Sequence, residues 1–394
     1  MSANVTADAV DAQHREGDDR RTFLRKLAGA AALSPLVSLF PAIDPLGARA
    51  ATLSSQQLAG QRVIFSYSGL TVPSALLDQI AAGQAAGVIF FGGNISSDAQ
   101  IAAVIQQLRQ AQQQSPIASP LLLMTDQEGG LVRRLPGAPT MSEKQIGQSS
   151  NPPLAASQAG TGARQNLAGV SMNVNLAPVL DVYRQAGDFD DQYQRSYSKK
   201  PSVVSACGQA FITAQQQTGV AATAKHFPGL GAAAASQNTD TGPVTLSQSL
   251  STLRAVDEAP YPAVISAGVK LIMVSWAIYP ALDRAYPAGL SSAVVGGELR
   301  ARLGYQGVTI TDALEAGALA AFGRRRAAGG SRRRHRNGPH PLLGPGRRPG
   351  PVRHDRPGQC AGCRAAELER LQRGSAAGRC PAQHTALSPR GTHR

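Results

Sequence analysis

A chain of 394 residues with a net charge of +14 has room for one large domain or two smaller ones, and its basicity suggests an acidic partner until the charge is located. The tail from Arg324 to Arg394 holds 17 Arg, no Lys and three acids, so it carries the whole net charge, and the first 323 residues are neutral. The body is therefore not a basic nucleic-acid-binding domain, and no apolar run reaches the ~18–20 residues of a membrane span.

Residues 1–50 predict an export signal of the twin-arginine type. Arg20 and Arg21 precede a short apolar stretch at 27–40, and Ala48 and Ala50 supply the small residues that signal peptidase favours. A soluble amphipathic helix is the alternative, but Pro35 would interrupt it. No Cys follows the apolar stretch, so we expect export without a lipid anchor, to an extracytoplasmic or cell-wall-associated location.

The body at 51–323 alternates apolar, strand-like runs with Ala- and Gln-rich stretches of helical spacing such as 97–113 and 203–217. Runs that are apolar on both faces and alternate with helices favour a parallel sheet covered by helices. The strands are expected at 62–66, 87–91, 120–125, 171–176, 220–224, 270–275 and 307–311. Seven such units predict an α/β fold of the TIM (β/α)₈ barrel type that lacks a proper eighth βα unit.

Polar residues follow these strand runs at the ends where a barrel places its active site. Two carboxylates, Asp126 and Asp312, share this expected rim with four cationic or imidazole side chains, Arg134, Arg195, Lys225 and His226. A carboxylate near Arg or Lys stays ionised at neutral pH, as a nucleophile or a hydroxyl-binding acceptor must. The alternative is a ring of structural salt bridges, which explains less well why so many polar groups coincide.

Four motifs then occur in order: Asp-Gln-Glu-Gly-Gly from Asp126, Ala-Pro-Val-Leu-Asp-Val from Ala177, Lys-His-Phe-Pro-Gly from Lys225, and Ile-Thr-Asp-Ala-Leu from Ile310. Together they resemble glycoside hydrolase family 3, in its single-domain β-N-acetylhexosaminidase branch, over 51–323. The resemblance implies a retaining enzyme that releases terminal β-linked N-acetylglucosamine from peptidoglycan fragments or chitooligosaccharides, and the N-terminal signal makes us expect that this enzyme is exported.

The same resemblance assigns roles to the rim residues. It makes Asp312 the nucleophile of a double displacement through a glycosyl-enzyme intermediate. Five residues would hold and orient the sugar: Asp126, Arg134, Arg195, Lys225 and His226. It implies a carbohydrate substrate, no cofactor and no metal, and we expect a monomer that binds no nucleic acid.

One loop departs from the family pattern. Hexosaminidases of the family usually carry an Asp-x-His pair after Lys-His-Phe-Pro-Gly, with the His as general acid/base, but the loop at 231–243 contains no His. Asp240 is its only titratable group, and it could serve as the acid if burial raised its pKa. It could equally be an Asx-type turn residue ahead of Gly242 and Pro243. The sequence leaves both interpretations open.

The tail at 324–394 is the second departure. It has a single Val and no Ile, Phe, Tyr, Trp or Met, so it cannot offset its chain entropy and is expected to be disordered and basic. Its composition is typical of out-of-frame translation of a GC-rich gene. An Arg-rich arm for nucleic acid, or a zinc site at Cys360, Cys363 and His354, would be rival functions. We interpret these features as accidents of the altered frame.

Other functions remain open from the sequence. A β-glucosidase or xylosidase of the same family would usually add a second domain with an acidic catalytic residue. A catalytically impaired sugar-binding barrel is consistent with the missing loop His and eighth unit. Substrate-assisted hexosaminidases use an adjacent Asp-Glu pair, but Asp257 and Glu258 are interpreted as helix N-terminal charge. The sequence does not determine the aglycone, the oligomeric state or the activity of a chain with this C-terminus.

Overall fold

The computed structural model describes residues 53–322. The expected export signal at 1–50 and the basic tail at 324–394 lie outside the described residues, so the structure does not test them.

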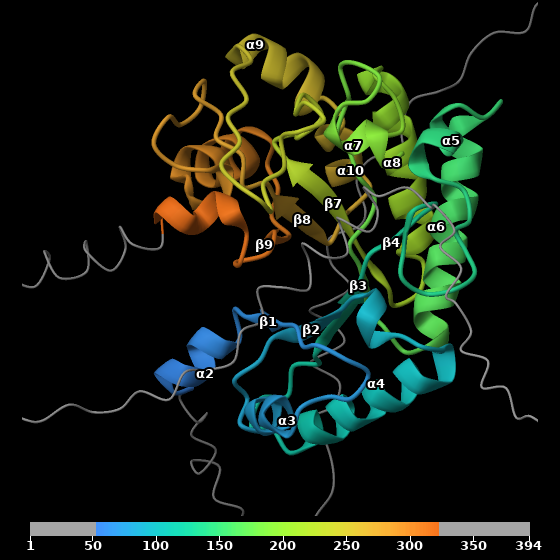
Figure 1. The fold of residues 1–394 in the computed structure, drawn as a ribbon, viewed down its shortest axis with the longest axis vertical. Coiled ribbons are helices and arrows are strands. Elements are labelled where there is room, and N and C mark those ends of the chain that lie inside the picture. The colour runs from blue at the N-terminus through green and yellow to red at the C-terminus, as the bar shows by residue number, and fades with distance from the viewer. Residues whose placement is uncertain (1–52, 323–394) are drawn as a thin grey trace, which may run out of the picture. The chain divides into compact units, whose positions relative to one another are not determined.

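The described part of the chain forms one seven-stranded parallel sheet in the order β1-β2-β3-β6-β7-β8-β9 (Figure 1). Each strand run expected from the sequence overlaps one of these strands, and only β7 extends beyond its expected run. They are β1 (Ile64–Phe65), β2 (Gly87–Phe90), β3 (Leu122–Thr125), β6 (Val174–Asn175), β7 (Ala221–Phe227), β8 (Leu271–Val274) and β9 (Val308–Thr311). A small antiparallel hairpin, β4 (Gln127–Gly129) and β5 (Val132–Arg133), follows β3 directly.

The strand order is sequential and never reverses, which is the winding of a barrel rather than of a doubly wound open sheet. The predicted barrel-type fold is confirmed to this extent, as a parallel half-barrel. Within 53–322, β1 and β9 are the two edges and no eighth strand lies between them. Val308 on β9 is 53% exposed, whereas the four residues of β8 beside it are all buried.

Helices connect the strands and cover the outside of the sheet (Figure 1). The α-helices are α2 (Ser55–Gly60), α3 (Ser74–Ala81), α4 (Asp98–Gln113), α5 (Glu143–Gly147), α6 (Pro152–Gly169), α7 (Phe189–Gln192), α8 (Pro201–Gln215), α9 (Leu250–Thr252) and α10 (Tyr261–Ser266). Two π-helical stretches span Leu253–Asp257 and Ala293–Arg302. Within residues 53–322, 3₁₀ turns lie at Gly92–Asn94, Ala288–Leu290 and Gly317–Leu319. None of the described helices is both long and apolar enough to cross a membrane.

Local sequence explains the longer helices. Ser97 caps α4 by accepting a hydrogen bond from the Gln100 N–H, and Ile101, Ile105 and Leu108 repeat at helical spacing on its buried face. Pro201 starts α8 at a position where the missing N–H costs nothing. The expected helices at 97–113 and 203–217 are thereby confirmed, with small shifts at their ends.

Alternate strand residues build two apolar layers, as the two-residue period of a strand requires. Met124, Leu176 and Met273 lie inside the curve of the sheet, where partly buried Ile64 and Ile310 from the two edge strands pack against them. Their neighbours in sequence face the helices in two larger clusters. At the two edge strands β1 and β9 the inner apolar layer is only partly buried, and Ile64 and Ile310 there also line the cavity described next.

Candidate active site

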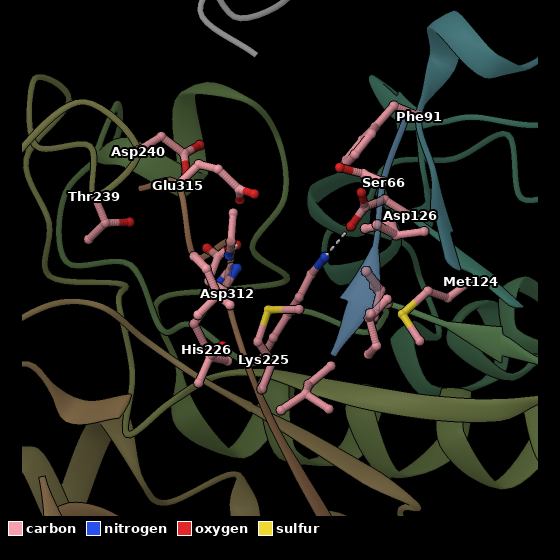
Figure 2. Close-up of a pocket in the computed structure, with 18 of the residues that line it drawn as sticks. Ser66, Phe91, Met124, Asp126, Lys225, His226, Thr239, Asp240, Asp312 and Glu315 are labelled. Atoms are coloured by element: carbon pink, nitrogen blue, oxygen red, sulfur yellow. Dashed lines mark hydrogen bonds and ion pairs between the residues drawn. The ribbon is translucent and has the colours of Figure 1, made fainter. Parts of the chain in front are cut away.

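A cavity of about 530 Å³ lies at the carboxyl ends of the strands. All the site residues expected from the sequence line it: Asp126, Arg134, Arg195, Lys225, His226, Asp240 and Asp312. Figure 2 shows Asp126 on one wall, with Asp240 and Asp312 on the other and Lys225 between them. The cavity also reaches both edge strands, β1 and β9.

Asp126 lies between β3 and the β4–β5 hairpin, and that hairpin brings Arg134 back beside it. Gly129 has φ +117°, and a β-carbon there would lie 2.2 Å from the Met141 carbonyl oxygen, so this turn requires glycine. Arg134 donates its backbone N–H to the Asp126 carbonyl at 3.2 Å, and its Nη2 lies 3.9 Å from Asp126 Oδ2. The Asp-Gln-Glu-Gly-Gly motif is thus a turn that pairs a carboxylate with a guanidinium.

Lys225 is more deeply placed than a rim residue. The sequence ends its strand at 224, but β7 continues to Phe227 and leaves Lys225 only 2% exposed. Its Nζ lies 2.8 Å from Asp126 Oδ1 and 2.8 Å from Glu128 Oε1. Burial alone would lower the pKa of Lys225, but these carboxylates raise it above its usual range. Burial alone would raise the pKa of Asp126, but Lys225 and Arg134 hold it well below its usual range, so Asp126 is ionised at neutral pH.

Arg195 is engaged by carboxylates of the protein itself. Its Nε and Nη2 donate to both Glu128 oxygens at 2.9 Å, and its Nη1 donates to Asp190 Oδ1 at 3.0 Å. Three of its five donors are therefore used within the protein. Glu128 is buried at the centre of this network, and burial would raise its pKa, but Arg195 and Lys225 lower it. Sequence reasoning passed over Glu128, although it lies two residues after Asp126.

His226 is held by a buried carboxylate. Its Nδ1 lies 2.6 Å from Asp181 Oδ2, and Asp181 Oδ1 accepts the Leu230 N–H at 2.5 Å. Burial would lower the pKa of His226, but Asp181 raises it, which favours the imidazolium with its second N–H available on the cavity side. Asp181 is the acid of the Ala-Pro-Val-Leu-Asp-Val motif, and it acts through His226 because it is itself buried.

Asp190 completes this buried group. Burial raises the pKa of Asp190 to about 7; Arg195 opposes the rise and the negative charge of Asp181 adds to it. Asp181, Asp190 and His226 place ligand-type atoms within 4.8 Å of one another. Asp181 already bonds to His226, and Asp190 already bonds to Arg195, so the cluster does not have the chemistry of an open metal site.

Asp312 and Asp240 stand on two segments that are tied together. Asp312 follows β9 directly, and its Oδ1 accepts the Ala313 N–H at 2.7 Å. Gly317 donates its N–H to the Asp240 carbonyl at 2.8 Å, so the loop at 231–243 docks on the segment after Asp312. In the Asx turn of this loop, Asn238 Oδ1 accepts the Asp240 N–H at 2.8 Å. The turn residue is therefore Asn238, and Asp240 is placed in the cavity lining.

Asp257 and Glu258 lie elsewhere, and neither lines the cavity. Asp257 is the last residue of the π-helical stretch Leu253–Asp257, so the expectation of helix N-terminal charge is wrong. Both acids are buried, and each is paired with an arginine that compensates its charge: Asp257 with Arg184 at 2.5 Å, and Glu258 with Arg302. The adjacent Asp-Glu pair is structural.

The sequence profile of the "Glycosyl hydrolase family 3 N terminal domain" matches residues 59–331. The chain belongs to glycosyl hydrolase family 3. It is 47% identical over 287 residues to an "Uncharacterized secreted glycosyl hydrolase" of Arthroderma benhamiae, covering 72% of this chain and 81% of the relative. The resemblance inferred from the motifs is thereby confirmed.

Two solved structures share both fold and sequence with this chain. A family 3 β-N-acetylglucosaminidase from Paenibacillus sp. str. FPU-7 matches with TM-score 0.64 and 32% identity over 68% of this chain and 51% of that protein. A β-N-acetylhexosaminidase from Beutenbergia cavernae matches with TM-score 0.60 and 32% identity over 68% of this chain and 80% of that protein. This chain therefore spans about half the length of the Paenibacillus protein.

Proposed function

We propose that this protein is an exported, retaining β-N-acetylhexosaminidase that releases terminal β-linked N-acetylglucosamine from peptidoglycan fragments or chitooligosaccharides. The carrying observation is the division of the cavity, with the ionised Asp126–Lys225 pair on one side and Asp312 on the other (Figure 2). The activities for which the Paenibacillus and Beutenbergia relatives are named support N-acetylglucosamine as the sugar, and the description of the Arthroderma relative as secreted supports export.

The side of the cavity formed by Asp126, Arg134 and Lys225, called the charged wall below, binds the terminal sugar. Asp126 accepts hydrogen bonds from sugar hydroxyls, and Arg134 donates to them. Lys225 uses two of its three donors on Asp126 and Glu128 and offers the third to the substrate. The His226 imidazolium donates from Nε2, because Asp181 holds Nδ1. Arg195 acts mainly by orienting Glu128 and Asp190.

Asp312 then attacks the anomeric carbon of the bound sugar. Its carboxylate forms an ester to C1 as the glycosidic C–O bond breaks, and a water molecule later hydrolyses this ester with net retention. The leaving oxygen also needs a proton donor on the Asp312 side of the cavity, where the carboxyls of Asp240 and Glu315 both line the wall. The buried positions of Asp257 and Glu258 favour this double displacement over substrate assistance.

A specific observation also favours a second candidate, a catalytically impaired sugar-binding barrel. The cavity extends to the unpaired edges of β1 and β9 within the described residues, so one side of the site is less enclosed than in a closed barrel. Such a protein would hold N-acetylglucosamine through the charged wall and turn it over slowly.

An assay of the full chain on matched aryl glycosides tests the proposal. We expect hydrolysis of the aryl β-N-acetylglucosaminide, little hydrolysis of the aryl β-glucoside, and a first-formed β-anomer by proton NMR. Preference for the glucoside would favour the β-glucosidase alternative. An α-anomer would contradict double displacement, and binding without turnover would favour the sugar-binding candidate.

A further inference from the structure

Glu315 is a third carboxyl on the wall that carries Asp312 and Asp240. It follows Asp312 by three residues and lines the same cavity. Figure 2 shows its carboxyl group reaching into the cavity from this wall. Nothing in the four sequence motifs singled it out, because the Ile-Thr-Asp-Ala-Leu motif ends one residue before it.

The backbone on both sides of Glu315 is fixed. Trp276 Nε1 donates to the Ala313 carbonyl at 2.8 Å, and Trp276 packs in one cluster with Ala316 and Ala318. Gly317 donates its N–H to the Asp240 carbonyl at 2.8 Å, so the turn after Glu315 is joined to the loop at 231–243. The side chain of Glu315 is exposed, although the residues that follow it are buried or half-buried. A fixed backbone therefore presents a solvent-exposed carboxyl to the cavity.

The acid/base of a retaining glycosidase has two tasks. It protonates the departing glycosidic oxygen, and it later takes a proton from the water that attacks the glycosyl-enzyme ester. It must therefore be reached by the leaving group and by water in turn. Glu315 meets this requirement through its exposure and its position in the cavity.

Asp240 meets the requirement less well. Its Oδ1 is removed from solvent contact, its N–H is bonded to Asn238 Oδ1, and its carbonyl is bonded to Gly317. Both backbone groups of Asp240 are therefore bonded, which fixes the position of the backbone that carries this short side chain. This geometry suits a residue that anchors the loop at 231–243 to the segment after Asp312. The side of the cavity that carries Asp240, Asp312 and Glu315 is called the catalytic wall below.

We propose that Glu315 is the general acid/base of this enzyme and that Asp240 is a positioning residue. The inference rests on the proposed double displacement at Asp312. In the first step Asp312 bonds to C1, the C1–O bond to the aglycone breaks, and the Glu315 proton passes to the leaving oxygen. In the second step water bonds to C1, its proton passes to the Glu315 carboxylate, and the ester to Asp312 breaks. Both carboxyls return to their starting states.

The test compares Glu315→Gln with Asp240→Asn in the full chain, on a dinitrophenyl β-N-acetylglucosaminide and on chitobiose. Loss of an acid/base should lower turnover of chitobiose by roughly 10²–10⁴-fold, and it should spare the cleavage step of the activated glycoside, whose leaving group needs little protonation. Sodium azide should restore turnover of the activated substrate by Glu315→Gln and yield the β-glycosyl azide, because azide needs no general base. We expect Asp240→Asn to lose activity equally on both substrates, without azide rescue.

Several outcomes would overturn the inference. Leaving-group dependence and azide rescue in Asp240→Asn, with Glu315→Gln behaving like the unsubstituted chain, would assign the acid/base to Asp240. Equal loss on both substrates in Glu315→Gln, with an unchanged thermal midpoint, would make Glu315 a binding residue. Asp312→Asn in the same assay distinguishes a failure of the Glu315 inference from a failure of the proposed function. If Asp312→Asn keeps its activity, or the unsubstituted chain turns over neither substrate, the proposed function itself is wrong.

Discussion

At the scale of single residues, Lys225 is the cation on which the charged wall depends. It is almost fully buried and neutralises both Asp126 and Glu128. Removing one partner of a buried ion pair leaves an uncompensated charge. We therefore expect Lys225→Met to lower the free energy of unfolding in urea by about 3–5 kcal/mol. Lys270→Met, at an exposed lysine just before β8, should change it by less than about 0.5 kcal/mol. Equal effects of the two substitutions would contradict the buried network.

Asp190 predicts a pH dependence of stability. Its pKa is raised to about 7 by burial, against about 3.9 in an unfolded chain. Between these values the folded state binds more protons, so the stability from neutral Asp190 is fully present below pH ~3.9 and is lost as the pH rises through about 7. The neighbouring His226, whose pKa is also raised, adds a loss in the same direction above pH ~6.5.

Asp190→Asn keeps the neutral form at every pH. We expect its free energy of unfolding, measured in urea at pH 5 and pH 8, to fall less with pH than that of the unsubstituted chain. Asp98→Asn, at an exposed carboxyl in the first turn of α4, should leave the slope unchanged. The same slope in Asp190→Asn and in the unsubstituted chain would mean that Asp190 is ionised in the folded protein.

At the residue scale, sequence reasoning found the site better than it found what supports the site. It placed Asp126, Lys225 and Asp312 together because each follows a strand run. Asp181 and Asp190 act only through tertiary contacts with His226 and Arg195, and those contacts carry no local signal. Whether Asp312 and Asp240 carry out catalysis remains a prediction.

At the scale of elements, the docking of the 231–243 loop on the segment after β9 positions the catalytic wall. A β-carbon at Gly317 would lie 2.5 Å from the carbonyl carbon and oxygen of Thr241, whereas one at Gly242 would meet nothing within 4 Å. We expect Gly317→Ala to displace the loop and lower kcat by about tenfold or more, since misplacement by 1 Å can cost 10²-fold. Gly242→Ala is the matched control and should keep kcat within about twofold. Equal kcat in the two variants would show that the docking does not position the wall.

The strands were the most predictable elements. Runs such as 87–91 and 270–275 are apolar on both faces, and this pattern is expected for a strand whose two faces are both buried. The last residues of β7 escaped prediction, because Lys225 and His226 interrupt the apolar run and look like a strand end. Their burial depends on Glu128 and Asp181, which lie 97 and 45 residues away in the chain.

At the scale of the whole molecule, β9 is an exposed edge of the sheet. Val308 is 53% exposed on it, whereas Ile272 on the neighbouring β8 is fully buried. We expect Val308→Lys to change the free energy of unfolding by less than about 0.5 kcal/mol, as at an ordinary surface position. Ile272→Lys should lower it by more than about 4 kcal/mol, since it buries an unpaired charge. If Val308→Lys proved as costly as Ile272→Lys, another segment would cover this edge in solution.

The barrel-type winding was predictable because seven strand runs alternate with helices in one direction along the chain. The location of the net charge was also predictable, because it follows from composition alone. The role assigned to the tail and the export signal remain predictions, since both lie outside the described residues.

Trapping of the glycosyl-enzyme tests the central claim most directly. A 5-fluoro-N-acetylglucosaminyl fluoride forms the ester quickly and hydrolyses slowly, so intact-mass analysis reports the covalent intermediate. We predict one sugar adduct per chain, located by peptide sequencing on Asp312 and absent in Asp312→Asn. An adduct on any other residue, or steady turnover by Asp312→Asn, would contradict the account.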